Sequence, residues 1–195
     1  MILLVHGWGF DATVWDGVRA ALPAGLEVEA LDLGFFGAPT AVPYSVTLAV
    51  GHSLGALWLL RQGIAPVLAV NGFPRFTAAP DFPQGVAPRM VERMARRLAD
   101  APAEVVDAFR DRCGAGPATA APDVDRLAWG LDLLLSADAR PAAPLRAIAG
   151  RQDPIVPPPM TEAAFGAAVT WIDGGHLLPL THPAPLAQAI LEALP

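Results

Sequence analysis

Lysine is absent from the sequence, and cysteine and tyrosine each occur once in 195 residues. All thirteen basic residues are therefore arginines. The abundance of alanine, proline and glycine favours genomic base composition as the reason, with selection for bidentate contacts to acidic partners as the alternative. Because Cys113 stands alone, no internal disulfide can form, and a reducing cytosol is the compartment we expect.

Charged residues are also scarce, at 16% of the chain, whereas 53% are hydrophobic. This balance is typical of a globular protein, and 195 residues suffice for one domain with a single sizeable core. A net charge of −6 argues against a nucleic-acid partner. No apolar run reaches the roughly 18–20 residues of a membrane span. The run at residues 1–7 lacks the basic leader of a signal peptide, so we expect a cytoplasmic protein without membrane contact.

Six short, continuously apolar runs predict strands that are buried on both faces of a parallel sheet. They are Ile2–Val5, Leu26–Leu31, Val46–Val50, Pro66–Val70, Leu145–Ala149 and Val169–Ile172. Helical patterns separate most of them, at Val14–Leu22, Leu54–Gln62, Pro158–Phe165 and Pro183–Leu194. This alternation predicts an α/β fold with a six-stranded, mostly parallel, doubly wound sheet. Ligands of such sheets bind at the carboxyl ends of the strands.

The alternation stops between Asn71 and about Pro144, where no strand is evident. Three amphipathic segments occupy this stretch: Pro88–Ala99, Pro102–Arg112 and Pro122–Leu135. Apolar residues recur in them at helical spacing, and joints rich in proline and glycine separate them. We interpret residues 74–143 as a helical lid inserted within a single domain of residues 1–195, and call them the lid segment.

A Gly-His-Ser-Leu-Gly pentapeptide, residues 51–55, follows one predicted strand and precedes a predicted helix. This is the strand–turn–helix setting of a nucleophile elbow, in which Ser53 is the nucleophile. The flanking glycines leave room for a serine on so tight a turn. The turn lifts the hydroxyl clear of the sheet and directs the next backbone N–H toward a reacting carbonyl.

Two further residues complete the order Ser…Asp…His that this type of hydrolase uses. Asp153 follows the strand predicted at residues 145–149, before a proline-rich turn, and is the expected acid. His176 follows the last predicted strand and is the expected base. Taken alone, Asp153 could simply cap its own turn. Three weaker candidates for these roles are Asp173, Asp132 and His182.

Two backbone N–H groups would complete such a site as an oxyanion hole. The N–H of Leu54 directly follows the nucleophile, and the N–H of Trp8 lies in the loop after the first predicted strand. Gly7 and Gly9 let this loop approach a substrate closely. The alternative interpretation of the loop is a plain strand-to-helix turn.

With these motifs the chain resembles the α/β-hydrolase family over nearly its whole length. Within that family it is most similar to the pimeloyl-acyl-carrier-protein methyl ester esterases of biotin synthesis. The similarity rests on Leu4-Val5-His6-Gly7-Trp8-Gly9-Phe10, Val14-Trp15, Gly51-His52-Ser53-Leu54-Gly55, Asn71-Gly72-Phe73-Pro74-Arg75-Phe76 and Phe109-Arg110-Asp111-Arg112-Cys113-Gly114. The resemblance implies a serine carboxylesterase that hydrolyses the methyl ester of a pimeloyl group on acyl-carrier protein through an acyl-enzyme.

The chain looks like a shortened version of this fold. We expect the fold to lack the pair of strands that usually precedes the loop at residues 6–9, because Met1 leads directly into the first predicted strand. The helix that usually precedes the elbow strand is also missing, and His52 stands where those esterases have tryptophan. We therefore expect the strand predicted at residues 26–31 to form the edge of the sheet, where a partner could cover it.

The resemblance also suggests where substrate and carrier would bind. Candidates for the walls of an acyl tunnel, which could equally be ordinary core residues, are Phe73, Phe76, Phe82, Phe109, Cys113, Trp129 and Leu177. Candidates for carrier binding are Arg89, Arg93, Arg96, Arg97, Arg110 and Arg112, with Arg75 near them in sequence. Four of these arginines share residues 88–98 with one glutamate, an excess of three positive charges on an acidic protein. They suit a phosphate and an acidic carrier surface, although the pattern also fits a solvated helix face.

Two other functions stay open at this point. One is a generic short-chain carboxylesterase or thioesterase with the same triad. The other, from a different class, is a catalytically silent hydrolase fold that acts as a binding module. No metal or organic cofactor is expected, because no two histidines stand at the spacing of a ligand pair. The four are His6, His52, His176 and His182.

Overall fold

A computed structural model describes residues 1–64, 66–144 and 146–195. Within these residues six strands pair in parallel throughout and form one sheet with the order β2-β1-β3-β4-β5-β6. They are β1 (Ile2–Val5), β2 (Val28–Leu31), β3 (Leu48–His52), β4 (Val67–Val70), β5 (Arg146–Gly150) and β6 (Val169–Ile172). The predicted fold class is confirmed, with strand ends that differ by up to two residues. Leu145, predicted to begin the fifth strand, lies outside the described residues.

Helices cover both faces of the sheet, because successive side chains of each strand point to opposite sides. Ile2 and Leu4 of β1 share a hydrophobic cluster with residues of α1 and α8. Leu3 and Val5 belong to a second cluster, which includes residues of α2. The helices outside the lid segment are η1 (Ala12–Trp15), α1 (Asp16–Ala21), α2 (Leu54–Gln62), α6 (Pro158–Phe165), α7 (Leu178–Thr181) and α8 (Pro183–Ala193). The helix predicted at 14–22 is thus divided into η1 and α1, and α7 was not predicted.

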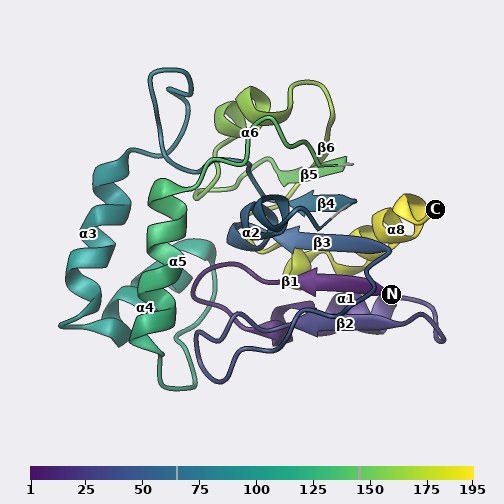
Figure 1. Cartoon of the computed structure of the whole chain (residues 1–195), viewed down its shortest axis with the longest axis horizontal. Coiled ribbons are helices and arrows are strands. Elements are labelled where there is room, and N and C mark those ends of the chain that lie inside the picture. Colours follow the sequence, from purple (N-terminus) through teal and green to yellow (C-terminus); the bar gives the residue numbers. More distant parts are fainter. Residues whose placement is uncertain (65, 145) are drawn as a thin grey trace.

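The lid segment contributes three helices between β4 and β5. They are α3 (Pro88–Leu98), α4 (Pro102–Cys113) and α5 (Val124–Ser136). Proline occupies the first turn of α3 and of α4, where its missing N–H is tolerated, and the Asp123 side chain caps α5. Figure 1 shows all three helices beyond the carboxyl ends of the strands. They therefore stand where a doubly wound sheet binds its ligands.

The second cluster, which contains Leu3 and Val5, joins the lid segment to the sheet. Leu3 and Leu57 from the sheet side belong to it together with Val91, Val106 and Leu131 from the three lid helices. All five side chains are buried. The lid segment is therefore packed as part of the same core as the sheet and does not have a separate core of its own.

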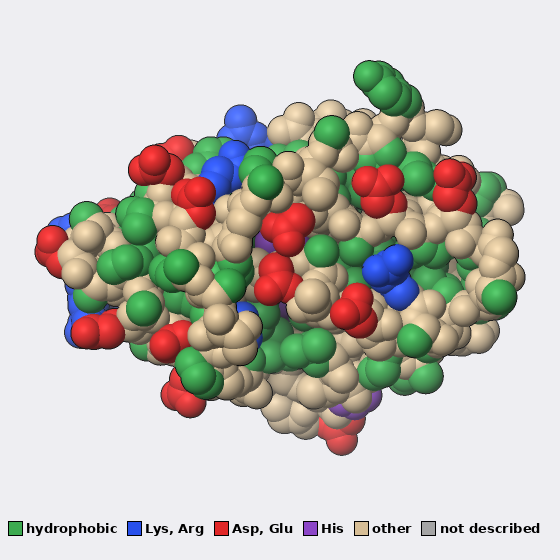
Figure 2. All heavy atoms as spheres, turned by 90° about the horizontal axis from the view of Figure 1, so that it is seen from below, with side chains coloured by type: hydrophobic (Ala, Val, Ile, Leu, Met, Phe, Trp, Pro, Cys, Tyr) green, Lys and Arg blue, Asp and Glu red, His purple; other side chains and the backbone are tan. Residues whose placement is uncertain are grey.

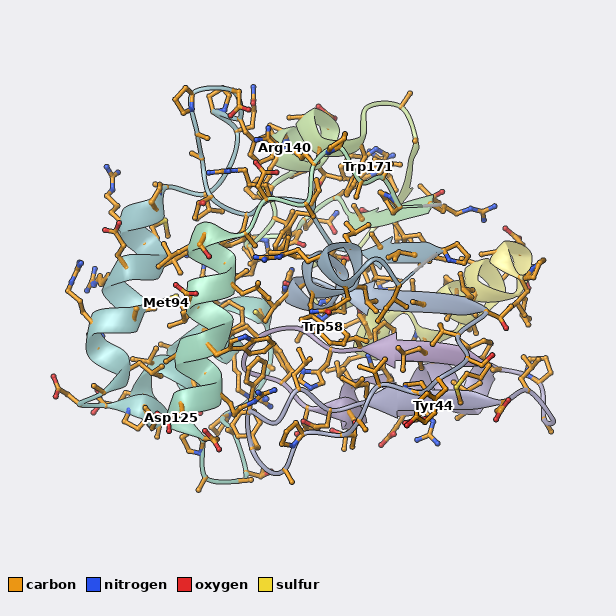
Figure 3. All side chains as sticks on the ribbon, in the orientation of Figure 1. Tyr44, Trp58, Met94, Asp125, Arg140 and Trp171 are labelled. Carbon is orange, nitrogen blue, oxygen red and sulfur yellow. The ribbon has the colours of Figure 1, made fainter. Side chains whose placement is uncertain are left out.

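Strand β2 lies at the edge of the sheet, as predicted. In the described residues no helix stands between β2 and β3, and the chain runs there as an irregular segment. Tyr44 of this segment, labelled in Figure 3, has a fully exposed side chain. Leu26, two residues before β2, and Val42, two residues before Tyr44, are also exposed. Whether a partner covers this edge stays a prediction.

Acidic side chains are spread over the surface shown in Figure 2. Arginines reach that face at a few places, including the end of the molecule that α3 and α4 form. Among the helices of the described ranges, none has both the length and the apolar character needed to span a bilayer.

Candidate active site

Ser53 occupies a strained turn between β3 and α2. Its φ of 53° and ψ of −120° lie in a region that non-glycine residues rarely adopt. The residues two positions before and after it must be glycines. A Cβ on Gly51 would lie 2.4 Å from the backbone nitrogen of Ala56. A Cβ on Gly55 would lie 2.4 Å from the carbonyl oxygen of Val5. The close packing of β1, β3 and α2 thus explains both glycines of the pentapeptide.

Asp153 and His176 form a buried pair below this turn. The Nδ1 of His176 lies 2.8 Å from Oδ2 of Asp153, and both side chains are almost fully buried. Because a carboxylate can only accept, Nδ1 carries the proton and Nε2 is left as a bare acceptor. Nε2 has no hydrogen-bond partner among the described residues, Ser53 included. Catalytic hydrogen bonds in ligand-free sites are often long, so this geometry is compatible with proton transfer from Ser53.

Asp153 is held as a carboxylate by several donors. Its Oδ1 accepts the backbone N–H groups of Ile155 and Val156 at 2.8 and 2.9 Å. Its Oδ2 also accepts a short hydrogen bond from the Asn71 side chain. Burial raises the pKa of Asp153, but the interaction with His176 and these hydrogen bonds outweigh it and lower the pKa below its usual range.

Asn71 is a member of the site that the sequence analysis did not assign. It follows β4 with a φ of 46°, in the left-handed region that asparagine tolerates better than most residues. Its Nδ2 donates to Asp153 and, at 3.1 Å, to the carbonyl of Gly175 next to His176. One amide therefore fixes both members of the acid–base pair. The only local signal was a polar residue directly after a buried strand.

His52 is a second residue of the site to which the sequence assigned no role. Its Nε2 lies 2.9 Å from the carbonyl oxygen of His176, so Nε2 must carry the proton and donate it. The two imidazole rings lie 4.8 Å apart between their centroids. Complete burial, reinforced by His176, lowers the pKa of His52 to about 3, so the ring is neutral at ordinary pH. His52 thus holds the backbone of His176 without adding a charge beside it.

The loop of residues 6–10, which we call the oxyanion loop, lies against Ser53. A Cβ on Gly7 would be 3.0 Å from the Cβ of Ser53. Within the described part of the chain, neither the N–H of Trp8 nor that of Leu54 has an intramolecular partner. The Leu54 N–H also belongs to the first turn of α2, where the helix dipole favours negative charge. The arrangement can therefore receive an oxyanion.

An apolar cavity of about 50 Å³ opens beside Ser53. It is lined by Trp8, Ser53, Phe76, Val86, Met90, Val91, Met94, Phe109, Arg112, Leu134 and Ile155. Of the predicted tunnel residues, Phe76 and Phe109 line it. The others, which belong to the surrounding core cluster or its margin, are Phe73, Phe82, Cys113, Trp129 and Leu177. Burial raises the pKa of the Cys113 thiol to about 12, so this side chain behaves as an apolar one.

An arginine-lined groove of about 250 Å³ adjoins this cavity between α3 and α4. Its floor is apolar, and Arg93, Arg97 and Arg112 stand around it. Met90, Met94, Phe109 and Arg112 line both the groove and the cavity, so these four side chains separate them. The groove therefore offers positive charge next to the cavity that Ser53 lines.

The remaining arginines of the predicted carrier site are engaged differently. Arg96 lies 3.9 Å from Glu92, and Arg89 is exposed away from the groove lining. Arg75 pairs with Asp138 at 2.9 Å. Arg110 donates to the backbone carbonyls of Gly9 and Gly116, at 3.0 and 2.8 Å. Arg110 therefore points into the protein, whereas Arg93 and Arg97 face the groove.

The weaker sequence candidates lie outside the Asp153–His176 pair. Asp173 accepts a hydrogen bond from Gln152. Asp132 lines a separate polar hollow with Trp58 and Arg61. His182 precedes α8, with its ring beside the Thr181 hydroxyl. In the described ranges no three histidine, cysteine or acidic side chains gather in the manner of a metal site.

Solved structures share the fold described above. No model of a protein family matches the sequence. An esterase from Exiguobacterium antarcticum superposes with a TM-score of 0.75 at 15% identity, covering 98% of this chain and 90% of that one. BioG from Haemophilus influenzae superposes with a TM-score of 0.67 at 20% identity, covering 91% and 89%. This chain has the α/β-hydrolase fold.

The α/β-hydrolase assignment extends to curated relatives. The pimeloyl-[acyl-carrier protein] methyl ester esterase of Sodalis glossinidius is 27% identical over 98% of this chain and 92% of its own length. The resemblance found in the motifs is thus confirmed over the whole alignment. Such hydrolase and esterase relatives support an α/β-hydrolase enzyme.

Proposed function

We propose that the protein is a serine carboxylesterase in which Ser53, His176 and Asp153 act as nucleophile, base and acid. The observation that carries the proposal is the buried Asp153–His176 hydrogen bond of 2.8 Å, which leaves Nε2 of His176 without a partner among the described residues. The backbone carbonyl of His176 is bonded by His52, the residue directly before the strained Ser53. A bare imidazole nitrogen can accept a proton, and the strained turn exposes a hydroxyl that can supply one.

The reaction follows from these roles. The Ser53 oxygen attacks the ester carbonyl while Nε2 of His176 takes the serine proton, and Asp153 stabilises the imidazolium that forms. The N–H groups of Trp8 and Leu54 receive the negative charge on the carbonyl oxygen, each contributing about 2.7–4 kcal/mol to transition-state stabilisation. His176 then returns the proton to the departing alcohol. Water repeats the sequence on the acyl-enzyme and releases the acid.

The substrate that we favour is the methyl ester of a pimeloyl group on acyl-carrier protein, the substrate class named in the curated relatives. A chain tethered to a carrier at its far end cannot be enclosed in a closed pocket. The arginine-lined groove provides an exit beside the cavity, and its cations suit the phosphate that joins a prosthetic arm to a carrier. Flexible Met90 and Met94 separate groove and cavity, and methionine side chains repack readily.

A generic esterase for small esters is the second candidate. It is favoured by the small size of the cavity, about 50 Å³, which leaves little room for a long acyl chain. A short acyl group would need less rearrangement of the methionines than a long one. The two candidates share one mechanism and differ in whether the groove is used.

The test compares two substrates. Wild-type protein and Ser53→Ala are assayed on p-nitrophenyl butyrate and on pimeloyl-carrier methyl ester. We expect Ser53→Ala to lower kcat on both substrates by more than about 10³-fold. We also expect kcat/KM of the wild type to be far higher for the carrier ester. Equal kcat/KM on the two substrates would favour the generic esterase. Absence of wild-type activity on both esters would favour the binding module.

A further inference from the structure

Arg110 of α4 holds the outer end of the oxyanion loop. Its Nη1 donates to the carbonyl of Gly9 at 3.0 Å, and its Nε donates to the carbonyl of Gly116 at 2.8 Å. The guanidinium carbon also lies 4.7 Å from the centre of the Phe10 ring, within cation–π range. Within the described residues Arg110 forms no ion pair. Its charge is thus directed at backbone of the oxyanion loop.

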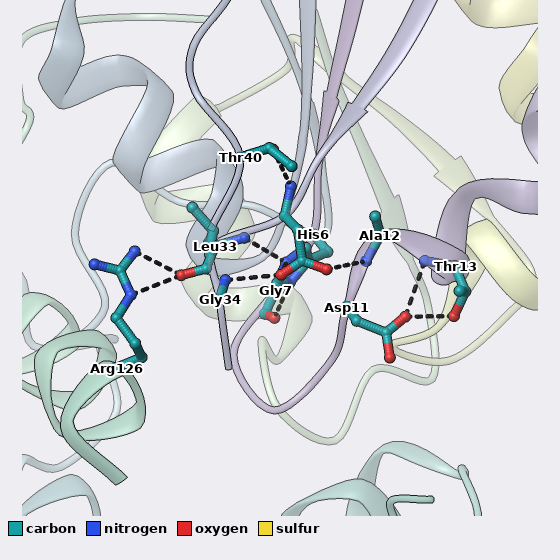
Figure 4. Close-up of polar contacts among 10 residues, drawn as sticks. His6, Gly7, Asp11, Ala12, Thr13, Leu33, Gly34, Thr40 and Arg126 are labelled. Atoms are coloured by element: carbon teal, nitrogen blue, oxygen red, sulfur yellow. Dashed lines mark hydrogen bonds and ion pairs between the residues drawn. The ribbon is translucent and has the colours of Figure 1, made fainter. Parts of the chain in front are cut away.

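Arg126 of α5 reaches the inner end of the same loop through two intermediates, as Figure 4 shows. Its Nε and Nη2 both donate to the Leu33 carbonyl, at 2.9 and 2.6 Å. The Leu33 N–H in turn donates to Nε2 of His6 at 2.9 Å. Nε2 therefore accepts, and Nδ1 carries the proton that it donates to the Gly7 carbonyl at 2.9 Å.

The side chain between these two carbonyls is also fixed by the lid segment. Trp8 donates its indole N–H to the Leu127 carbonyl of α5 at 2.9 Å. A Cβ on Gly130 would lie 2.6 Å from the Trp8 ring, so α5 packs directly on it. The Phe109 ring of α4 meets the Trp8 ring edge to face, with centroids 5.0 Å apart.

A trans peptide group points its C=O and its N–H in opposite directions. Fixing the Gly7 carbonyl therefore fixes the direction of the Trp8 N–H, the donor assigned to the oxyanion hole. Fixing the Gly9 carbonyl prevents the far side of the loop from rotating, which matters because Gly9 has a φ of +72° and few intrinsic restraints. One lid arginine directly, and the other through Leu33 and His6, thus contact the two carbonyls on either side of this backbone donor.

We propose that Arg110 and Arg126 are positioning residues for the oxyanion hole, so that the lid segment sets the catalytic geometry and does more than cover the site. This inference rests on the proposed function. It replaces carrier binding as the role of Arg110. It assigns a role to Arg126, which the sequence did not single out.

The experiment uses Arg110→Gln and Arg126→Gln, with Arg110→Lys and Arg126→Lys as conservative variants. Arg19→Gln is the matched control, because Arg19 lies on α1 in a surface pair with Asp16. kcat and KM are measured on p-nitrophenyl butyrate, which needs no carrier. Inhibition by a butyl boronic acid is measured in parallel, because its tetrahedral serine adduct places an oxygen in the oxyanion hole.

We expect each glutamine variant to lose about 10-fold or more in kcat, less than the roughly 10²–10³-fold loss when a donor is removed outright. KM should change less than twofold, and the boronic acid should bind more weakly by the same factor as kcat falls. The lysine variants should recover part of the loss, because lysine can still donate to a carbonyl. Arg19→Gln should match the wild type.

Several results would overturn the inference. One is an active wild type whose kcat and boronic acid affinity survive both glutamine substitutions. Another is a loss of kcat that the lysine variants do not restore and that is proportional to the loss of folded protein. The amount of folded protein is measured by titration with saturating boronic acid. If wild-type turnover survives Ser53→Ala, the proposed function fails first and this inference fails with it.

Discussion

At the scale of single residues, the site depends on histidines whose protons are placed by backbone carbonyls and a carboxylate. His6 and His52 donate to the carbonyls of Gly7 and His176, and His176 donates to Asp153. Each bond fixes which ring nitrogen carries the donated proton. The other nitrogen accepts from the Leu33 N–H in His6 and has no partner among the described residues in His52 and His176. The bare nitrogen of His176 is the one that the proposed mechanism needs. Protonation of His52 would place a positive charge beside the ring of His176 and disturb this arrangement.

The stability of the protein should therefore depend on the titration of His52. The pKa of His52 is about 3 in the folded protein against an ordinary value of 6.5, so the unfolded chain binds a proton first as pH falls. The free energy of unfolding should decrease from pH 6.5 down to about pH 3, by up to about 1.4 kcal/mol per pH unit from this group. His52→Gln keeps an amide donor for the His176 carbonyl but cannot titrate, so its slope should be shallower.

Urea unfolding at pH 4, 5, 6, 7 and 8 measures this difference. At pH 8 His52 is almost wholly neutral in both states, so the difference in stability between variant and wild type at this pH does not contain its titration and serves as the control. Parallel stability curves over the whole range would contradict the assignment of His52 as a buried neutral histidine.

At the scale of elements, α3 and α4 divide their faces between core and groove. Val91 and Leu98 of α3 are buried, whereas Arg93 and Arg97 stand at the groove. Arg97 also pairs with Glu104 of α4 at 3.1 Å, across an exposed surface where ion pairs contribute little to stability. The positive groove is thus a property of how the two helices pack, and charge reversal should change binding more than folding.

Arg93→Glu combined with Arg97→Glu should raise KM for a carrier-bound ester several-fold and leave kcat on p-nitrophenyl butyrate unchanged. The physical reason is that an acidic carrier is attracted over a distance that salt screens, so the wild-type KM should also rise with ionic strength. Steady-state kinetics on both substrates at 20 and 200 mM salt provide the measurement.

The same charge change away from the groove is the control for this experiment. Arg89→Glu combined with Arg96→Glu alters the same helix on residues that do not line the groove. It should raise KM for the carrier ester less than the groove variant does. Equal effects of the two double variants would show that only overall charge matters, and equal effects on both substrates would argue against carrier docking.

At the scale of the whole molecule, the sheet and the lid segment share one hydrophobic cluster. Elements that share a core cannot unfold separately without exposing that surface. The lid segment is also joined to the oxyanion loop by Arg110 and by the Trp8 indole. The protein should accordingly behave as one cooperative unit.

Leu131→Ala in α5 tests this unit. Leu131 is fully buried, so its truncation should lower the free energy of unfolding by about 2–5 kcal/mol. Thermal unfolding followed by far-UV circular dichroism and by tryptophan fluorescence should give a single midpoint, lowered equally for both probes. A lid transition that separates from the loss of sheet structure would show that the lid segment folds on its own.

The edge position of β2 was predicted from the resemblance to a shortened fold. The sequence by itself determined the succession of the six strands, most of the helices between them and the turn at Ser53. Each of these depends on a local pattern: an apolar run, a helical period, or glycines that only a tight turn requires. The candidate acid and base could be named because both follow predicted strands, and the structure places them in contact. Their roles in catalysis stay a prediction.

Only the tertiary structure decided which side chains support these groups. Asn71 and Asp153 are 82 positions apart, Arg110 and Gly9 are 101 apart, and His52 and His176 are 124 apart. No local period or motif links such pairs, because their meeting depends on how the strands are ordered and how α4 and α5 pack across the strand ends. The physical reason is that packing, not chain proximity, brings a donor to a carbonyl or a carboxylate.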